Sequence, residues 1–349
     1  MSFIINILLF IVILGIIVFV HEFGHFIWAK ITGVYVYEFS IGMGPKIIGK
    51  KGKETEYNIR AIPIGGFCQL AGENLDEDDA KKVPKERRLQ SKPAFQRFLI
   101  MVFGPLNNFI LAVILLLLIA AIWGGTTLNP IITTVEKESA AEIVGLKQND
   151  KIIKINNHKV TTSDDISLFL AVANPKKYNT IIVERNNKRI TIKIKPKKIV
   201  ENKKTTYRYG IGISQKKTHG FKNVFKYAFL KTKSIFKQMI VTVGYLFRGK
   251  VKLNQLSGPV GIYSIIGEQS KEGIANLIYI TALLSINVGF INHLPLPAFD
   301  GGHILFIIIE KIKGSPVKPE LENKIHTIFL ILLMILMLII TMSDIIKLF

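Results

Sequence analysis

Three side chains that could perform hydrolytic chemistry stand together in the segment "VFVHEFGHFIWAK", which begins at Val18. His21 and His25 are four residues apart, so on a helix they lie one turn apart on the same face and could bind one zinc ion. Glu22 lies beside them, where a carboxylate could act as a general base. The motif therefore predicts part of a zinc site that still needs a third protein ligand and an open position.

The third ligand must come from elsewhere, and the segment "NHLPLPAFDGGHI" offers three candidates. Asp300 is the only charged residue in the apolar stretch 274–309, which makes it the natural choice. His293 and His303 are competing ligands on the same segment, and spacing does not exclude them. Asp300 could also be a turn residue, since Asp-Gly pairs are common in turns.

Two of the asparagines in this apolar stretch lie close to the candidate ligands in sequence. Asn287 and Asn292 could line a watery cavity, where their amides could position a substrate carbonyl or hold an oxyanion. Hydrogen bonding between helices is the alternative role. If Asp300 completes the site, the predicted reaction is metal-assisted hydrolysis, in which zinc polarises a carbonyl and Glu22 accepts and passes on a proton.

The elements that must position these groups have the composition of membrane helices. Four apolar stretches are nearly long enough, or longer than needed, to cross a hydrocarbon core roughly 30 Å thick: residues 2–20, 98–123, 274–309 and 326–342. A removable signal peptide is the alternative for the first stretch, but this segment has neither a basic start nor a cleavage site of small residues. The third is too long for one crossing and is interrupted at Pro295 and Pro297, which predicts broken backbone beside protein or water.

Composition supports a membrane protein that also carries a polar domain. The chain has 349 residues, of which 49% are hydrophobic, and a formal net charge of +21. The basic residues are spread between the apolar stretches without a nucleic-acid-binding pattern, so we expect contact with anionic lipid and no nucleic acid. The single cysteine, Cys68, excludes an internal disulfide framework.

The middle of the chain changes character. Between residues 129 and 213, short β-rich runs alternate with Asn, Asp and Gly turns, which predicts a small β-rich domain. Residues 221–246 mix basic, aromatic and aliphatic side chains, as an interfacial helix or a helix packed on that domain would. We therefore expect an N-terminal membrane half (1–125), a β-rich domain (126–215), amphipathic linker or interfacial helices (216–273) and a C-terminal membrane half (274–349).

Charge in the short loops sets the expected orientation. Four spans place both termini on one side of the membrane. Since long domains translocate largely regardless of charge, we place segments 30–97 and 311–324 in the cytoplasm and the middle domain outside. The site then faces the cytoplasmic side of a bacterial inner membrane.

Six motifs follow one another along the chain: "HEFGHFIWAK", "FSIGMGPKI", "YNIRAIPIGGF", "GPLNNFI", "LSGPVGIY" and "NHLPLPAFDGGHI". In this order they resemble the bacterial site-2 protease family, in its RseP-like branch of intramembrane zinc metalloproteases. The resemblance implies that His21, His25 and Asp300 bind Zn²⁺ and that Glu22 is the catalytic glutamate. Asn292 looks like the family asparagine that assists catalysis.

Further positions follow from the same resemblance. Asn287 and Asn108, the latter in the Gly-Pro-x-x-Asn pattern, match family positions that we assign to substrate binding. The region around Gly65 and Gly66 is similar to a family segment that dips into the membrane as a β-hairpin and pairs with an unwound substrate helix. A cytoplasmic hairpin with only a structural role is the alternative. His293 stands where the family usually has leucine.

The middle domain resembles a PDZ domain through "SAAEIVGLKQNDKIIKINNHKV" and "YGIGI". Asn149 replaces the usual glycine of its turn, and asparagine tolerates the left-handed conformation. Only one PDZ copy is visible, and it could bind peptide C-termini or act as a size filter.

The expected protein is an α-helical polytopic membrane protein of about four transmembrane helices, with a membrane-associated β-hairpin and an inserted PDZ domain. Its expected function is regulated intramembrane proteolysis of single-pass proteins such as anti-sigma factors or remnant signal peptides. A non-catalytic PDZ scaffold and a zinc transporter are the alternatives. The retained Glu22 favours the protease.

Overall fold

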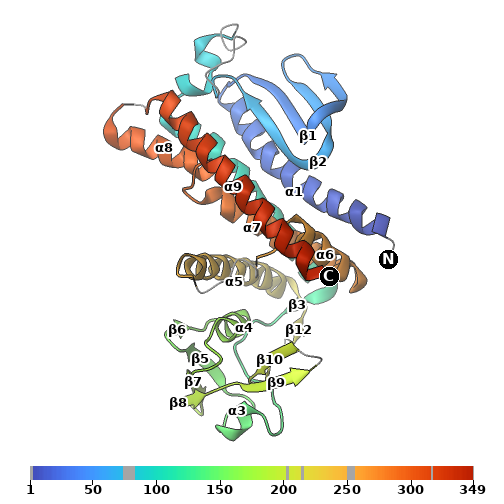
Figure 1. Ribbon diagram of the computed structural model, residues 1–349, viewed down its shortest axis with the longest axis vertical. Coiled ribbons are helices and arrows are strands. Elements are labelled where there is room, and N and C mark those ends of the chain that lie inside the picture. Colours follow the sequence, from blue (N-terminus) through green and yellow to red (C-terminus); the bar gives the residue numbers. More distant parts are fainter. Residues whose placement is uncertain are drawn as a thin grey trace. The chain divides into compact units, whose positions relative to one another are not determined.

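The chain folds into two compact units, shown in the computed structural model of Figure 1. The structure describes residues 3–73, 83–201, 204–213, 216–249, 256–315 and 317–348. The membrane unit comprises Met1–Leu115 and Leu253–Phe349, and the β-rich unit comprises Leu116–Lys252. Each unit is described separately below.

Within these described ranges, four helices are long and apolar enough to cross a membrane, as the sequence predicted. They are α1 (Phe3–Ile31), α2 (Ala94–Ile119) with the π-helical turn η4 (Ala120–Gly124), α7 (Ile274–His293) and α9 (Pro319–Leu348). The stretch 274–309 forms α7 and a separate helix α8 (Asp300–Lys313) of 14 residues. At 1.5 Å per residue α8 measures about 21 Å, which is too short to span.

One face of α1 is buried even though the helix is apolar almost all round. Its buried residues follow helical spacing and include both histidines: Ile13, Ile17, His21, Gly24, His25 and Ala29. Ile13 and Ile17 pack against Ile266 of α6 (Pro259–Lys271) and Ile280 of α7. The same stripe that fixes the helix in the unit therefore places the polar motif inside it.

A two-stranded antiparallel sheet, β1 (Val36–Lys51) and β2 (Glu56–Leu70), lies beside α1. The pairing has repeated register shifts, so the hairpin is irregular along its length. Residues Glu56 to Ile59 of β2 pair with β1 on both sides, whereas within the described residues Gly66 to Leu70 pair with β1 on one side only. Two short 3₁₀ turns, η2 (Lys85–Arg87) and η3 (Leu89–Ser91), lead from the hairpin region to α2.

The β-rich unit is built on a four-stranded sheet of order β6-β5-β7-β8. Its strands are β5 (Lys151–Ile155), β6 (His158–Lys159), β7 (Asn179–Arg185) and β8 (Lys188–Ile194). The helices α3 (Ala140–Ile143) and α4 (Ser163–Ala171) complete one core. The remaining strands pair as β9 (Lys197–Glu201) with β10 (Lys204–Arg208), β11 (Ile211–Gly212) with β4 (Thr134–Val135), and β12 (Lys217–Thr218) with β3 (Gly125–Thr126). Asn149 has φ +70°, which confirms the predicted left-handed turn.

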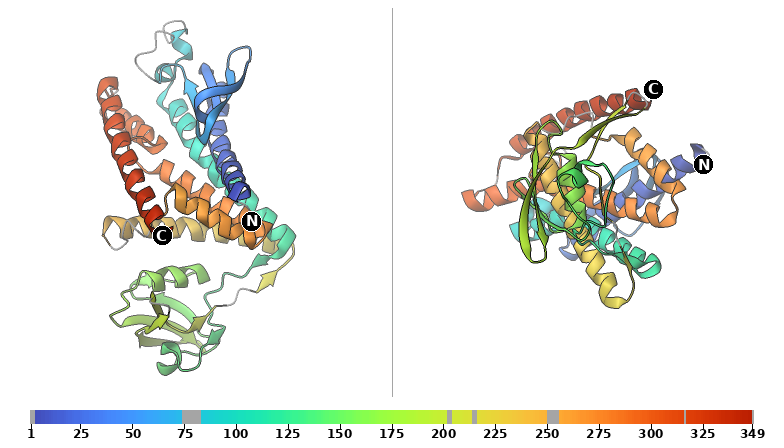
Figure 2. Two further views of the ribbon diagram at one scale, coloured as in Figure 1. Left: turned by 45° about the vertical axis from the view of Figure 1, so that its right-hand side comes forward. Right: turned by 90° about the horizontal axis from the view of Figure 1, so that it is seen from below.

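The helix α5 (Phe221–Phe247) lies across the side of the β-rich unit that carries α4, as Figures 1 and 2 show. Two of its lysines reach the acidic first turn of α4. Lys231 Nζ lies 2.8 Å from Asp164, and Lys237 Nζ lies 2.8 Å from Asp165. The helix dipole favours carboxylates at the N-terminus of α4. The two ion pairs connect this end of α4 to α5.

Candidate metal centre

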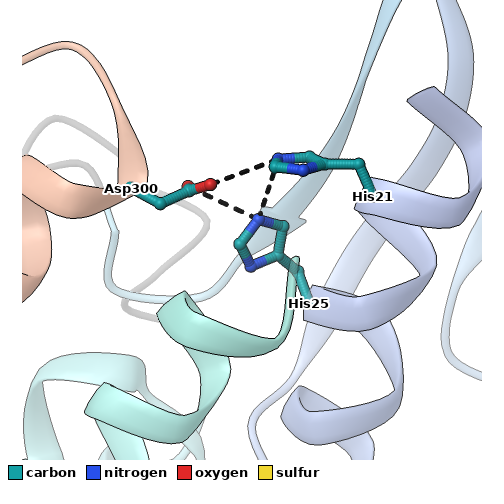
Figure 3. A group of neighbouring side chains, drawn as sticks. All are labelled: His21, His25 and Asp300. Atoms are coloured by element: carbon teal, nitrogen blue, oxygen red, sulfur yellow. Dashed lines mark hydrogen bonds and ion pairs between the residues drawn. The ribbon is translucent and has the colours of Figure 1, made fainter. Parts of the chain in front are cut away.

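His21 and His25 of α1 meet Asp300, the first residue of α8, in the membrane unit (Figure 3). His21 Nε2 lies 3.2 Å from Asp300 Oδ2, and His25 Nε2 lies 3.4 Å from Asp300 Oδ1. The two Nε2 atoms are 3.3 Å apart. Three potential ligand atoms from two distant segments thus converge on one point.

The hydrogen bonds around these atoms fit a bound cation. His25 Nδ1 lies 2.8 Å from the Ile100 carbonyl, to which it can only donate. In the neutral ring, the lone pair is therefore on Nε2 and faces His21 and Asp300. Asp300 Oδ2 is buried without a hydrogen-bond donor among the described residues. Two imidazole nitrogens and a carboxylate that face one another in this way form a donor set suited to zinc.

Asn108 of α2 supports the opposite side of His21. Its side-chain amide nitrogen lies 3.3 Å from His21 Nδ1, and the residue is fully buried. Ser285 of α7 donates to the Asn108 carbonyl at 2.8 Å and holds the backbone in place. With the amide turned by half a rotation, Oδ1 would accept Nδ1–H and leave His21 Nε2 free for a metal, as second-shell partners commonly do. The structure thus places Asn108 beside a candidate ligand.

Two glycines allow α1 and α2 to approach closely enough for this arrangement. A Cβ on Gly24 would overlap the backbone of Phe103, and a Cβ on Gly104 would overlap the imidazole of His25. Gly104 was not singled out from the sequence, although a Gly-Pro pair inside an apolar helix is an unusual signal. The absence of a side chain at Gly104 leaves the room that His25 occupies.

The break between α7 and α8 aims Asp300 at the histidines. Pro295 and Pro297 cannot continue the helix, because each lacks the backbone N–H of a helical hydrogen bond. The chain then turns back on the start of α8. A Cβ on Gly301 would overlap the Leu294 carbonyl, and one on Gly302 would lie 2.6 Å from the Leu296 oxygen. The two glycines after Asp300 are therefore explained by close backbone packing.

A cavity of about 520 Å³ opens onto the three candidate ligand residues. Its walls include Glu22 from α1 and a run of β2 from Phe67 to Leu70. A Cβ on Gly66 would lie 3.3 Å from Glu22 Cγ, so the missing side chain lets β2 come close to the helix. The predicted base and the predicted strand thus share one cavity.

The other predicted site residues lie apart from the three converging ligands. His293 Nδ1 contacts the Gly289 carbonyl at 3.0 Å, and His303 Nδ1 lies 3.3 Å from Glu322 Oε1. Asn287 and Asn292 lie in the last two turns of α7, outside the residues that line the cavity. Gly65 has φ +85° on β2, where the left-handed backbone favours glycine.

The chain is similar to known peptidases along almost its whole length. The sequence profile described as "Peptidase family M50" matches residues 9–336. The chain is 33% identical over 420 residues to the "Regulator of sigma-W protease RasP" of Bacillus subtilis, with 99% of both chains covered. It is 31% identical over 418 residues to the "Zinc metalloprotease RasP" of Geobacillus kaustophilus, with 99% of this chain and 98% of the relative covered.

Proposed function

The chain belongs to peptidase family M50, and from this premise we propose that it is a zinc metalloprotease that cleaves transmembrane segments. The family membership confirms the resemblance inferred from the sequence motifs. The observation that carries the proposal is the convergence of His21, His25 and Asp300 beside Glu22 in one cavity. Its four candidate spans make it a multi-pass membrane protein.

In the proposed mechanism, His21, His25 and Asp300 hold zinc, which supplies Lewis-acid polarisation of the scissile carbonyl. Glu22 takes a proton from the attacking water and delivers it to the leaving amine. Glu22 and Cys68 line the same cavity as the three candidate ligands. Ile100 and Asn108 fix the orientation of the two imidazole rings.

The outer edge of β2 at Gly66 to Leu70 is the proposed substrate platform. A transmembrane helix hides its carbonyls in internal hydrogen bonds, so it must unwind before a peptide bond can be hydrolysed. An extended segment can pair with Gly66 to Leu70 of β2 by strand addition, because within the described residues this part of the strand pairs with β1 on one side only. Gly65 and Gly66 lie on this strand, and the segment Phe67 to Leu70 leads the platform into the cavity.

The β-rich unit acts, in this proposal, as a PDZ domain on the external side of an inner membrane. The proposal is supported by the PDZ-like segment "SAAEIVGLKQNDKIIKINNHKV", which contains α3 and β5, and by "YGIGI", which contains β11. The active site then lies toward the cytoplasm. A single PDZ domain would screen substrates by size or bind a C-terminus exposed by an earlier cut.

The helix α5 lies at the membrane surface in this arrangement. Six exposed apolar residues recur at intervals of four and seven, and so form one stripe: Phe221, Phe225, Phe229, Phe236, Ile240 and Phe247. Within the β-rich unit, α5 also contacts η4, where the second candidate span ends. A helix with one face on its domain and an aromatic stripe on the other is suited to the lipid interface.

Candidate substrates are single-pass membrane proteins. The name of the Bacillus subtilis relative, regulator of sigma-W protease, supports a role on a membrane-bound anti-sigma factor. Remnant signal peptides are the second substrate class. A non-catalytic scaffold would cleave neither, and a zinc transporter would move metal across sealed vesicles without cleavage.

The test is cleavage of a tagged transmembrane substrate by the reconstituted protein, with Glu22→Gln as the matched variant. We expect the variant to retain one equivalent of zinc and to lose cleavage by a factor of at least about 100, as for removal of a general base. Chelation should abolish cleavage by the unmodified protein, and added zinc should restore it. Equal cleavage by both proteins would refute the role of Glu22.

A further inference from the structure

The segment between α7 and α8 contains one residue in an unusual backbone conformation. Ala298 has φ +70°, in the left-handed region that residues with a Cβ rarely adopt unless their surroundings hold them there. It lies two residues before Asp300. The conformation of Ala298 therefore sets the direction in which the chain enters α8.

The hydrogen bond of the Ala298 N–H differs from those of its neighbours. The N–H groups of Leu294, Leu296 and Phe299 donate to backbone carbonyls close in sequence. The Ala298 N–H instead donates to Nδ1 of His326 on α9, at 2.9 Å. The strained residue is thus held by a side chain from another helix.

The His326 ring is itself fixed in orientation. It stacks on His303 of α8 at a centroid distance of 4.2 Å and an interplanar angle of 20°. The ring centroid of Phe306, one turn further along α8, lies 5.5 Å from that of His326. Stacking against two α8 side chains holds Nδ1 toward the Ala298 N–H.

A second metal site is the other possible use of this cluster. Ligand atoms of His303, Glu322 and His326 all lie within 4.8 Å of one another. Nδ1 of His326, however, accepts a backbone N–H, so in the neutral ring the proton is on Nε2. Neither nitrogen of His326 then has a free lone pair for a metal. The hydrogen bonding favours structural support over metal binding.

We propose that His326 is a positioning residue for the metal centre. By accepting the Ala298 N–H, it holds the break between α7 and α8 in the shape that directs Asp300 toward His21 and His25. The hydrogen bond links α9 to the segment just before Asp300, although the two segments are distant in sequence. This inference deepens the proposed function and rests on it.

Two variants separate the hydrogen bond from the stacking. His326→Phe keeps an aromatic ring against His303 but removes the acceptor. His326→Asn loses the ring, but its Oδ1 can take the place of Nδ1 as acceptor. We expect His326→Phe to hold zinc at least about tenfold more weakly in competition with a chelator, in the range of outer-shell losses. We expect His326→Asn to stay within a few-fold of the unmodified protein.

Amide hydrogen exchange of Ala298 in the metal-free protein gives a readout that does not depend on activity. The amide should be protected in the unmodified protein and in His326→Asn, and should exchange at least about tenfold faster in His326→Phe. Equal exchange and equal zinc affinity in all three proteins would overturn the inference. So would a zinc stoichiometry of two that falls to one in both variants, which would indicate a second metal site.

The two proposals fail in different ways. If the unmodified protein neither binds zinc nor cleaves a substrate, the proposed function fails, whatever the exchange of Ala298. If it binds zinc and cleaves while the variants behave alike, only the role of His326 fails.

Discussion

The space around His25 is set by a residue that has no side chain. Gly104 faces the imidazole so closely that a single added methyl group would overlap the ring. On the other side, Ile100 accepts the Nδ1 hydrogen bond from the same ring. The ring therefore cannot move away from an added methyl without losing that bond. The position of the His25 ring and its tautomer therefore both depend on the turn of α2 that carries Ile100 and Gly104.

We predict that Gly104→Ala abolishes stoichiometric zinc binding and cleavage, because the methyl group displaces the His25 ring. Metal content after purification in zinc and cleavage of the model substrate measure the two effects. Gly15→Ala is the matched control, since a Cβ at Gly15 on α1 meets nothing within 4 Å. Normal zinc content in Gly104→Ala would show that α1 and α2 can separate without loss of the site.

Asn108 provides a second prediction at this scale. Asn108→Leu keeps a buried side chain of similar size but cannot bond to His21, so zinc affinity should fall by about 10- to 100-fold. Asn108→Asp keeps an acceptor for His21 Nδ1–H and should retain more affinity than the leucine variant. Chelator competition measures both values. Identical affinities in the two variants would contradict an interaction through the His21 ring.

At the scale of the element, the helix α5 has two faces of different character. Tyr227, Lys231 and Ile235 are buried against the β-rich unit, whereas the aromatic stripe is exposed. Five lysines and no acidic residue occur between Phe221 and Phe247, so the helix suits a surface that is apolar within and anionic at its rim. A stripe of this size is unusual on a surface that faces only water.

We predict that a tryptophan at position 229 is quenched by brominated acyl chains in reconstituted vesicles. Trp28 and Trp123 are first replaced by phenylalanine, and Phe229→Trp is then introduced. Tyr178→Trp in the same background is the control, because Tyr178 is a well-exposed aromatic of the β-rich unit outside α5. Quenching should rise with the fraction of anionic lipid. Equal quenching at 178 and 229 would argue against a membrane-facing α5.

At the scale of the whole molecule, each unit has its own stabilising interactions. In the β-rich unit, Asp150 is fully buried and accepts two hydrogen bonds from Arg185, each at 2.7 Å. Burial opposes ionisation, but the bonds from Arg185 and from the Lys147 N–H outweigh it and hold the pKa of Asp150 below its usual value. Arg185 of β7 thereby holds the turn that precedes β5.

This interaction predicts an acid-dependent loss of stability confined to the β-rich unit. Because the folded state lowers the pKa, the stabilisation is complete above the ordinary aspartate pKa of about 3.9 and is lost as the pH falls below it. Hydrogen-exchange protection of the Ile152 and Val183 amides in the full chain measures it. Asp150→Asn should reduce protection at pH 7 and flatten its decline below about pH 4. If protection in Asp150→Asn declines with pH as in the unmodified protein, the acid-dependent loss arises from other carboxylates.

Much of this organisation could be predicted from the sequence, where the cause is local. The four apolar stretches predicted the spans, and the spacing of His21 and His25 predicted their shared helical face. The choice of Asp300 over His293 and His303 could not be made from spacing, because it depends on how α8 packs against α1. His326 was missed because its contact with Ala298 joins two segments with no common pattern.

If Gly66 to Leu70 of β2, which pair with β1 on one side only within the described residues, are the substrate platform, this edge has a consequence for turnover. An uncut substrate strand could pair with the edge on both sides of the scissile bond, whereas each product keeps only the hydrogen bonds on its own side. Since dissociation rates rise steeply as contacts are lost, both fragments should leave faster than the intact chain. Hydrolysis itself would then promote product release. A substrate that pairs in the wrong register is not cut, and it would behave as a slowly released inhibitor.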